Sequence, residues 1–379
     1  MNLAGDENLA EDIAHLLPLN YNFEIPKSIA RIRKTGAKRV ALQFPEGLLM
    51  YGMPISDIIT KYTGSYAVIL ADATYGACCV DDLTARAMLS CDFLIHYGHS
   101  CLINIKTECI LPGRILYVFV DITIDLSHFV QTVEKCLPLE QFPKLAIFST
   151  VQFVVALRSA VKRLTDAGYD LFIPQVKPLS RGEVLGCTSP VIPDDIGTVV
   201  YLGDGRFHME SVMIGNERTG SADDTQRRFL QYDPYTQILS EQQYDYKSMK
   251  CNRKAAILQA RHAQRVVIVL GTLGRQGSTK ILKRLETLLQ SRGVEYAVFL
   301  ISELSPTKVH LYFTKDYDAV VQIACPRLSI DWGSSYPLPL LNPYEAEVML
   351  GYAQWVEDTQ KPYPMDHYAH EGGKWATYT

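Results

Sequence analysis

The sequence lacks the features of several protein classes. Its 37 basic and 41 acidic side chains leave a formal charge of −4, which excludes a broadly basic surface that coats nucleic acid. No stretch approaches the about 20 consecutive apolar residues of a transmembrane helix. The first 27 residues contain no basic segment followed by an apolar one, so no secretory signal is expected. We therefore expect a cytoplasmic protein that binds neither nucleic acid directly nor membranes.

Cysteine pairs with the spacing CxxC are also absent. The nine cysteines are spread over 379 residues, with no CxxC pair of the kind found in zinc ribbons. Their number is odd and their density low, which excludes the disulfide framework of a small secreted domain. Most cysteines of an intracellular protein are small buried residues, and we expect Cys91 and Cys136 to be of this kind.

What the sequence does contain is a repeated α/β unit. With 47% hydrophobic and 21% charged residues, the chain has the composition of a folded protein. Three short apolar runs each precede a small-residue turn and a helical pattern, which is the start of a βαβ unit. These runs lie at 40–44, 145–148 and 266–270. Three later runs, at 93–96, 199–202 and 319–323, are apolar at almost every position rather than alternating, which indicates parallel strands covered on both faces.

The regular spacing predicts an α/β fold of three related small domains, each a parallel sheet flanked by helices. One large doubly wound domain with a smaller one is the alternative. A helix at 126–136 and a polar helix at 237–264 are expected near the boundaries. The predicted parts are 1–128 with Cys78, 129–245 with Cys187, 246–355 with Cys325, and a C-terminal tail, 356–379. The tail lacks helical periodicity, so we expect it to wrap a surface or to be partly mobile.

Three cysteines, one in each repeat, lie at turns beside predicted strands. They are Cys78, Cys187 and Cys325, and small residues precede each of them. Ligands of open α/β sheets bind at strand ends, so three related domains could direct these turns to a shared centre. Such thiolates could hold zinc with a water, or a [4Fe–4S] cluster with one open iron. A role as small buried residues is the alternative.

Several long motifs resemble one family. They are residues 71–82 (ADATYGACCVDD), 96–102 (HYGHSCL), 185–188 (LGCT), 201–208 (YLGDGRFH), 233–235 (DPY), 274–277 (GRQG) and 324–333 (ACPRLSIDWG). In this order, they resemble the first subunits of 2-(3-amino-3-carboxypropyl)histidine synthase, which acts in the first step of diphthamide biosynthesis. The resemblance extends over nearly the whole chain, from about residue 24 to residue 350.

The resemblance implies an activity and a set of partners. Three α/β domains would surround a central cavity, where Cys78, Cys187 and Cys325 hold a [4Fe–4S] cluster. The 3-amino-3-carboxypropyl group of S-adenosylmethionine would be transferred by a radical mechanism to C2 of a histidine of elongation factor 2. A heterodimer with the second subunit and a small metal-binding electron donor are also implied. The alternative is a non-catalytic partner subunit that positions the elongation factor for a sister chain.

Other residues near predicted strand ends are candidates for binding S-adenosylmethionine. They are Glu46, Asp204, Arg206, Gly271 and Gly274. The glycine turn is spaced GxxGxxG, which differs from the GxGxxG of dinucleotide sites, and its backbone N–H groups could contact a carboxylate. Asp204 could bind an ammonium group and Arg206 a carboxylate; an Asp cap and a surface Arg are equally expected. Zinc ligation by His96, His99 and Cys101 is conceivable, but core roles are favoured.

Overall fold

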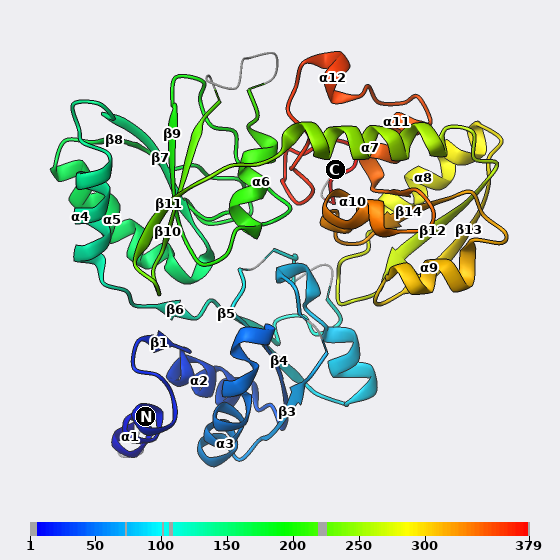
Figure 1. The fold of residues 1–379 in the computed structure, drawn as a ribbon. Helices are drawn as coiled ribbons and strands as arrows, with labels where there is room; N and C mark the ends of the chain where they lie inside the picture. The colour runs from blue at the N-terminus through cyan, green and yellow to red at the C-terminus, as the bar shows by residue number, and fades with distance from the viewer. Residues whose placement is uncertain (1–5, 73, 101, 106–108, 219–225, 378–379) are drawn as a thin grey trace. The chain divides into compact units, whose positions relative to one another are not determined.

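The computed structural model describes residues 6–72, 74–100, 102–105, 109–218 and 226–377. The chain divides into two compact units. The first contains Met1–Val130 and Ser149–Arg163, and the second contains Gln131–Phe148 and Leu164–Thr379. Figure 1 shows an α/β protein in which three largely parallel sheets are flanked by helices, as the sequence predicts. The division into three domains and the central cavity remain predictions.

The first sheet lies in the first unit and has the strand order β3-β2-β4-β5. Its strands are β2 (Arg39–Gln43), β3 (Tyr66–Leu70), β4 (Phe93–Tyr97) and β5 (Ile115–Val118), all parallel. Helix α2 (Ile25–Thr35) buries Ile25, Ile29 and Ile32, which share one helical face, and it ends where Gly36 takes a φ of 63°. Helix α3 (Gly52–Thr63) contributes Ile55 and Ile59 to the same core.

Shorter elements complete the first unit. They are α1 (Asp6–Leu16), the antiparallel pair β1 (Tyr21–Asn22) and β6 (Asp121–Ile122), the 3-10 helices η2 (Glu46–Tyr51) and η3 (Ala77–Cys79), and the short π-helix η4 (Thr84–Met88). Helices α4 (Leu126–Cys136) and α5 (Val154–Asp166), with η5 (Val151–Phe153) before α5, follow in the chain. The helix predicted at 126–136 is thus confirmed.

The second sheet has the order β11-β10-β9-β7-β8 and lies in the second unit. Its strands are β7 (Lys144–Ser149), β8 (Asp170–Phe172), β9 (Thr198–Leu202), β10 (Arg228–Asp233) and β11 (Ile238–Gln242). Helix α6 (Phe207–Gly215) packs Val212 and Met213 against Val199 and Tyr201 of β9.

The helix predicted at 237–264 is wrong in its first part. Residues 238–242 form β11, which pairs antiparallel with β10 through a turn in which Asp233 accepts the N–H of Tyr235. Helix α7 (Tyr246–Ala260) begins only after Asp245, whose carboxylate accepts the N–H of Ser248. A polar edge strand and a polar helix both lack a long apolar run, so composition alone did not separate them.

The arrangement of the third sheet explains the apolar run in the sequence of its strand β12. Its order is β13-β12-β14-β15, with β12 (Arg265–Gly271), β13 (Glu295–Ile301), β14 (Ala319–Ile323) and β15 (Leu340–Leu341) all parallel. Val266 and Ile268 share a core with α8 (Thr279–Ser291), whereas Val267 and Val269 share one with α9 (Pro306–Phe313). Successive side chains thus enter opposite cores, so the residues from Val266 to Leu270 are all apolar.

The described part of the C-terminal tail has both buried and exposed residues: Tyr363, Met365 and Tyr368 are buried, whereas Lys361, His370 and Lys374 are exposed. They follow α10 (Arg327–Trp332), η7 (Gly333–Ser335), α11 (Pro343–Met349) and α12 (Val356–Thr359). Tyr363 is fully buried, and its hydroxyl donates to Glu345 at 2.8 Å and accepts from Asn342 at 2.7 Å. Glu345 is itself paired with buried Arg253, Nε to Oε1 at 2.6 Å. The tail is therefore anchored on a buried ion pair.

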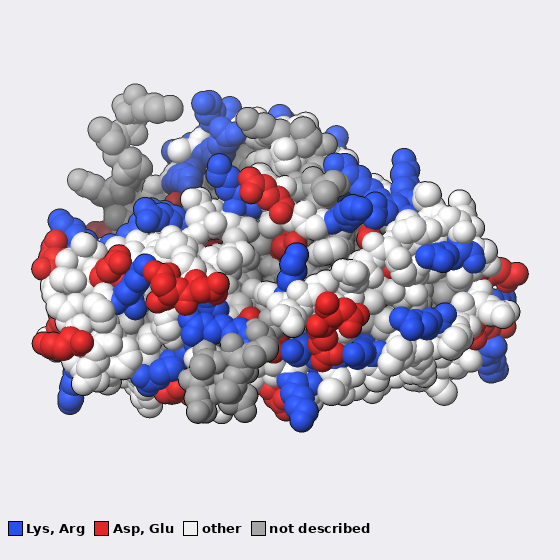
Figure 2. All heavy atoms as spheres, turned by 90° about the horizontal axis from the view of Figure 1, so that it is seen from above, with Lys and Arg blue, Asp and Glu red and all other residues white. Residues whose placement is uncertain are grey.

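Two further observations bear on the expected class. Among the described residues, no helix is long and apolar enough to cross a membrane. On the face drawn in Figure 2, basic and acidic side chains are interspersed. This mixture agrees with the near balance of charges in the sequence.

Candidate functional site

The three cysteines proposed as ligands differ from the others in their exposure. Cys78, Cys187 and Cys325 are half-buried, and they are the three half-buried thiols among the eight cysteines that the structure describes. Cys79, Cys91 and Cys109 are buried, whereas Cys136 and Cys251 are exposed. Thiols that are shielded but still reachable are suited to hold a cofactor.

The expectation of burial is confirmed for Cys91 and wrong for Cys136. Cys136 is the last residue of α4, and the core beside it is occupied by Leu137, which is 1% exposed. Val133 and Phe129, on the buried face of the same helix, are fully buried. An apolar neighbourhood in the sequence therefore did not establish which face carries the cysteine.

Cys187 and Cys325 lie close together within the second unit. Burial, together with the charge of the nearby Cys325 sulfur, raises the pKa of the Cys187 thiol to about 12. Two neighbouring thiolates in a buried setting are unfavourable unless a positive group compensates their charge. A bound metal centre would provide such compensation, so this pair of donors fits one.

Arg327 connects the turns of these two cysteines. It follows Cys325 by two residues, is 1% exposed, and donates from Nη1 to the backbone oxygens of Gly186 at 3.2 Å and Phe207 at 2.8 Å. Its guanidinium lies 4.4 Å from the centre of the Phe207 ring and pairs with Glu210 at 2.7 Å and Asp331 at 2.8 Å. This side chain thus fixes the residue before Cys187 relative to the start of α10.

The C-terminal segment holds the other side of the Cys187 turn. The backbone oxygen of Met365 accepts the N–H of Ser189 at 2.6 Å, and the hydroxyl of Thr188 accepts the N–H of Tyr368 at 3.1 Å. Tyr368 also donates its hydroxyl to the backbone oxygen of Gln276 at 3.4 Å. The tail therefore links the Cys187 turn with the glycine-containing turn after β12.

The Cys78 turn lies beside a buried polar chain in the first unit. Gln43 bonds to the backbone at Cys79 and Asp81, and His96 Nδ1 lies 2.8 Å from Gln43 Oε1. His96 Nε2 lies 3.1 Å from His99 Nδ1. Burial, reinforced by His99, holds the pKa of His96 well below its ordinary value, so His96 stays neutral. Cys101 lies outside the described residues, and zinc ligation with the two histidines stays a prediction.

The structure connects the turns of two of the three predicted ligands, Cys187 and Cys325, through Arg327. In the described ranges, no three His, Cys, Asp or Glu side chains are grouped so as to hold a metal ion. Cys78 belongs to the first unit, and Cys187 and Cys325 belong to the second. The joining of Cys78 with the other two remains a prediction.

The predicted S-adenosylmethionine residues lie at strand ends. Glu46 begins η2 after β2 and is exposed. Asp204 is exposed in the turn after β9. Arg206 donates to the backbone oxygen of Gln243 at 2.7 Å and lies 3.3 Å from Glu210, so its guanidinium has partners within the protein. The binding role of each residue remains a prediction.

The two glycines of the turn after β12, Gly271 and Gly274, are favoured over other residues for different structural reasons. A Cβ on Gly271 would lie 2.7 Å from the Cβ of Ala324, so the residue next to Cys325 requires glycine there. Gly274 has a φ of 54°, which favours glycine. The turn then leads to α8, where Ser278 accepts the N–H of Ile281. Gly271 thus packs beside the Cys325 turn, although this shows no ligand contact.

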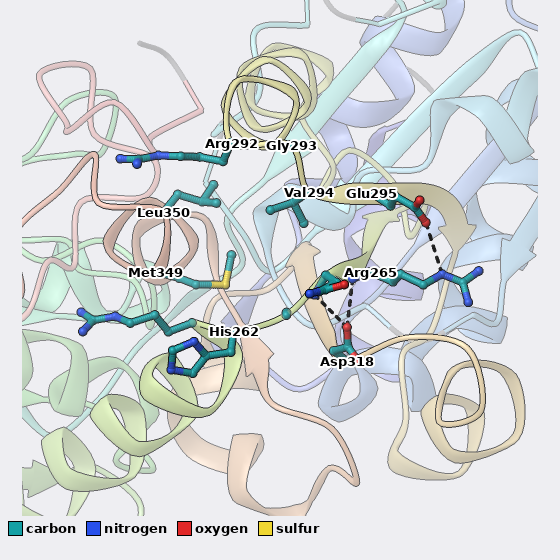
Figure 3. A pocket seen from close by; sticks show the side chains of 12 residues that line it. His262, Arg265, Arg292, Gly293, Val294, Glu295, Asp318, Met349 and Leu350 are labelled. Atoms are coloured by element: carbon teal, nitrogen blue, oxygen red, sulfur yellow. Dashed lines mark hydrogen bonds and ion pairs between the residues drawn. The ribbon is translucent and has the colours of Figure 1, made fainter.

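A large cavity lies at the other end of the third sheet. Its volume is about 920 Å³, and its walls include Arg261, Arg265, Arg292 and Glu295 (Figure 3). Arg265 and Glu295 begin β12 and β13, whereas Cys325 follows the carboxyl end of the parallel strand β14. This cavity is therefore separate from the cysteine edge of the sheet, and no sequence motif pointed to it.

Sequence reasoning missed the glutamines that hold the turns. Gln43 and Gln322 are at most 2% exposed although both lie in apolar strands. A polar residue within a continuous apolar run was the available signal, because a buried amide requires partners. The contact of the tail with the Cys187 turn had no signal in the sequence.

Comparison with known proteins identifies the family. The model of the diphthamide synthesis protein family matches residues 44–360. The chain is 52% identical over 372 residues to 2-(3-amino-3-carboxypropyl)histidine synthase subunit 1 of Dictyostelium discoideum, covering 96% of this chain and 75% of that protein. It is 50% identical over 361 residues to the protein of the same name of Homo sapiens, covering 95% and 78%.

The fold agrees with a solved structure at low sequence identity. The crystal structure of Dph2 from Pyrococcus horikoshii with a 4Fe-4S cluster matches with a TM-score of 0.71 at 23% identity. The match covers 93% of this chain and 95% of that one. Because the family model matches most of the chain and the relatives are about half identical to it, the chain belongs to the diphthamide synthesis protein family.

Proposed function

We propose that this chain is the cluster-carrying subunit of a 2-(3-amino-3-carboxypropyl)histidine synthase. It transfers the 3-amino-3-carboxypropyl group of S-adenosylmethionine to C2 of a histidine of elongation factor 2, the first step of diphthamide biosynthesis. The observation that carries this proposal is identity of about half of all residues, across 95% of the chain, with proteins named for this activity.

Cys78, Cys187 and Cys325 would hold a [4Fe–4S] cluster. Their half-buried thiols and the closeness of Cys187 to Cys325 support this assignment. When bound, a cluster with three cysteine ligands supplies an electron and an open iron position for a co-substrate. The protein's own part is to keep the turns in place and to compensate charge, and buried Arg327 brings a cation beside Cys187.

The remaining expectations complete the proposal. S-adenosylmethionine would contact the strand-end residues Glu46, Asp204, Arg206, Gly271 and Gly274, in a central cavity between three domains. The second subunit of the synthase would form a heterodimer with this chain in the cytoplasm. A small metal-binding protein would deliver the electron.

The test is anaerobic purification of single cysteine variants together with the partner subunit. Cys78→Ala, Cys187→Ala and Cys325→Ala should each lower the iron content and abolish release of methylthioadenosine in the presence of elongation factor 2. Cys251→Ala and Cys79→Ala are matched controls, since one removes an exposed thiol and the other removes the thiol adjacent to Cys78. Both controls should keep wild-type iron.

Two outcomes would contradict the proposal. A wild-type protein without iron under these conditions would exclude the cluster. Full activity of a heterodimer whose triad is removed from this chain alone would instead favour the non-catalytic role, with the chemistry carried by the sister subunit.

A further inference from the structure

A buried glutamine lies near the carboxyl end of one strand in each of the three sheets. They are Gln43 of β2, Gln231 of β10 and Gln322 of β14, which are 2%, 7% and 0% exposed. An amide is costly to bury unless its donor and its acceptor find partners. In all three sheets the amide group bonds to the backbone of a turn.

Gln322 holds the Cys325 turn at two points. Its Oε1 accepts the N–H of Ala324 at 2.8 Å, and its Nε2 donates to the backbone oxygen of Cys325 at 3.1 Å. Nε2 also donates to the hydroxyl of Ser329, at 3.0 Å, in α10. Because the amide both donates and accepts, it bonds the turn in the way a neighbouring strand would.

Gln43 makes the same arrangement at the Cys78 turn. Its Nε2 donates to the backbone oxygen of Cys79 at 2.8 Å, and its Oε1 accepts the N–H of Asp81 at 3.1 Å. The two backbone groups fix the orientation of the amide, so Oε1 faces His96 Nδ1 at 2.8 Å as an acceptor. His96 Nδ1 must then carry the proton and donate a hydrogen bond to the Gln43 amide.

Gln231 holds a different turn, and toward the residues that the structure describes its amide bonds through the donor alone. Its Nε2 donates to the backbone oxygens of Gly203 and Gly205, both at 3.1 Å. That turn follows β9 and contains Asp204, but no cysteine. The Cys187 turn is held instead by the tail and by Arg327.

We propose that Gln43 and Gln322 are positioning residues of the cluster site, which fix the backbone of the Cys78 and Cys325 turns before the cluster binds. This inference rests on the proposed function. A residue that orients a metal ligand through its surroundings commonly changes metal affinity by about 10–100-fold when it is removed. Glutamate cannot take this role when charged, because a carboxylate has no donor for the backbone oxygen.

The experiment measures loss of the cluster to a chelator. The full chain is purified anaerobically as Gln322→Leu, Gln43→Leu and Gln231→Leu, and the decay of cluster absorbance is followed with excess bathophenanthroline. Gln322→Leu and Gln43→Leu should lose the cluster at least about tenfold faster than wild type. Gln231→Leu, which also removes a buried amide from a strand end, should lose it at the wild-type rate.

Folding is measured separately, on the cluster-free proteins, by the midpoint of urea denaturation. If all three variants are destabilised alike and lose the cluster alike, the glutamines have a structural role only and the inference is overturned. Loss of the cluster from Gln322→Leu at the wild-type rate would overturn the inference as well.

The isosteric Gln322→Glu and the shorter Gln322→Asn keep the inference testable if the leucine variant does not fold. Both should shift the electron paramagnetic resonance spectrum of the reduced cluster. In the glutamate variant the backbone oxygen of Cys325 loses its donor, and in the asparagine variant the shorter side chain reaches this oxygen only if the backbone moves. An unchanged spectrum in both would count against the inference. A wild-type chain without a cluster would contradict the proposed function itself, whereas a wild-type cluster with unaffected glutamine variants would contradict only this inference.

Discussion

The turns of Cys325 and Cys187 lie close together but are held in different ways. The Cys325 turn is held by a local tie, the hydrogen bonds of Gln322, which lies three residues earlier in the preceding strand β14. The Cys187 turn is held by two distant ties. These are the hydrogen bond from Arg327 to Gly186, 141 residues apart, and the hydrogen bond from the N–H of Tyr368 to Thr188, 180 residues apart. A local tie forms whenever its strand is in place, whereas a distant tie requires the whole unit to be folded.

The difference implies unequal sensitivity to substitution. Removing a distant tie affects the Cys187 turn and also the packing between two sheets and the tail. Removing the local tie should affect chiefly the turn itself. Substitutions at the distant ties therefore test how strongly the Cys187 turn depends on the rest of its unit.

The largest effect is expected for Arg327→Met. It leaves the partly buried carboxylate of Asp331 without its cation, leaves Glu210 paired with the more exposed Arg206, and removes the donor to Gly186. Loss of one partner of a buried ion pair costs about 3–5 kcal/mol, measured as the free energy of unfolding in urea.

Arg228→Met is the matched control for this variant. Arg228 also pairs with a glutamate and lies over an aromatic ring, but its side chain is 43% exposed. The control should cost at most about 1 kcal/mol. Equal losses in the two variants would show that burial of Arg327 is not what ties the turns together.

The comparison also separates what the sequence could predict from what it could not. Strands at 266–270 and 319–323 were predictable because both faces are buried and every residue except Gln322 is apolar. The three cysteines were predictable from their place at turns and from the family motifs. The distant contacts were not, because neither Tyr368 nor Arg327 carries a periodic pattern that names its partner. Only folding brings residues 180 apart into contact.

A second, pH-dependent effect is expected at Glu183, four residues before Cys187. The residue is 1% exposed, and burial raises the pKa of its carboxyl to about 7. The folded chain therefore keeps a proton that the unfolded chain releases above its ordinary pKa of 4.5. Stability should fall as pH rises from about 4.5 through 7.

Glu183→Gln should remove this dependence, because its side chain stays neutral. The variant should match wild type near pH 4 and be more stable at pH 8, by up to about 3 kcal/mol. Glu241→Gln serves as the control of opposite sign, since Arg228 lowers the pKa of Glu241. The test measures denaturation midpoints across this pH range for wild type and both variants. If the midpoint of Glu183→Gln changes with pH in parallel with that of wild type, Glu183 is not the source of the pH dependence.

The smallest effect is expected for Thr188→Val, which removes only the hydroxyl that accepts the N–H of Tyr368. Thr188 is fully buried, so the lost acceptor should cost about 1–2 kcal/mol, while Thr188→Ser keeps the hydroxyl and should cost less. Hydrogen exchange sharpens the test, because the Tyr368 amide should exchange faster in the valine variant while the N–H of Ala324, held by Gln322, keeps its rate. If both amides exchange faster, the two turns open as one unit, and the distinction between local and distant ties fails.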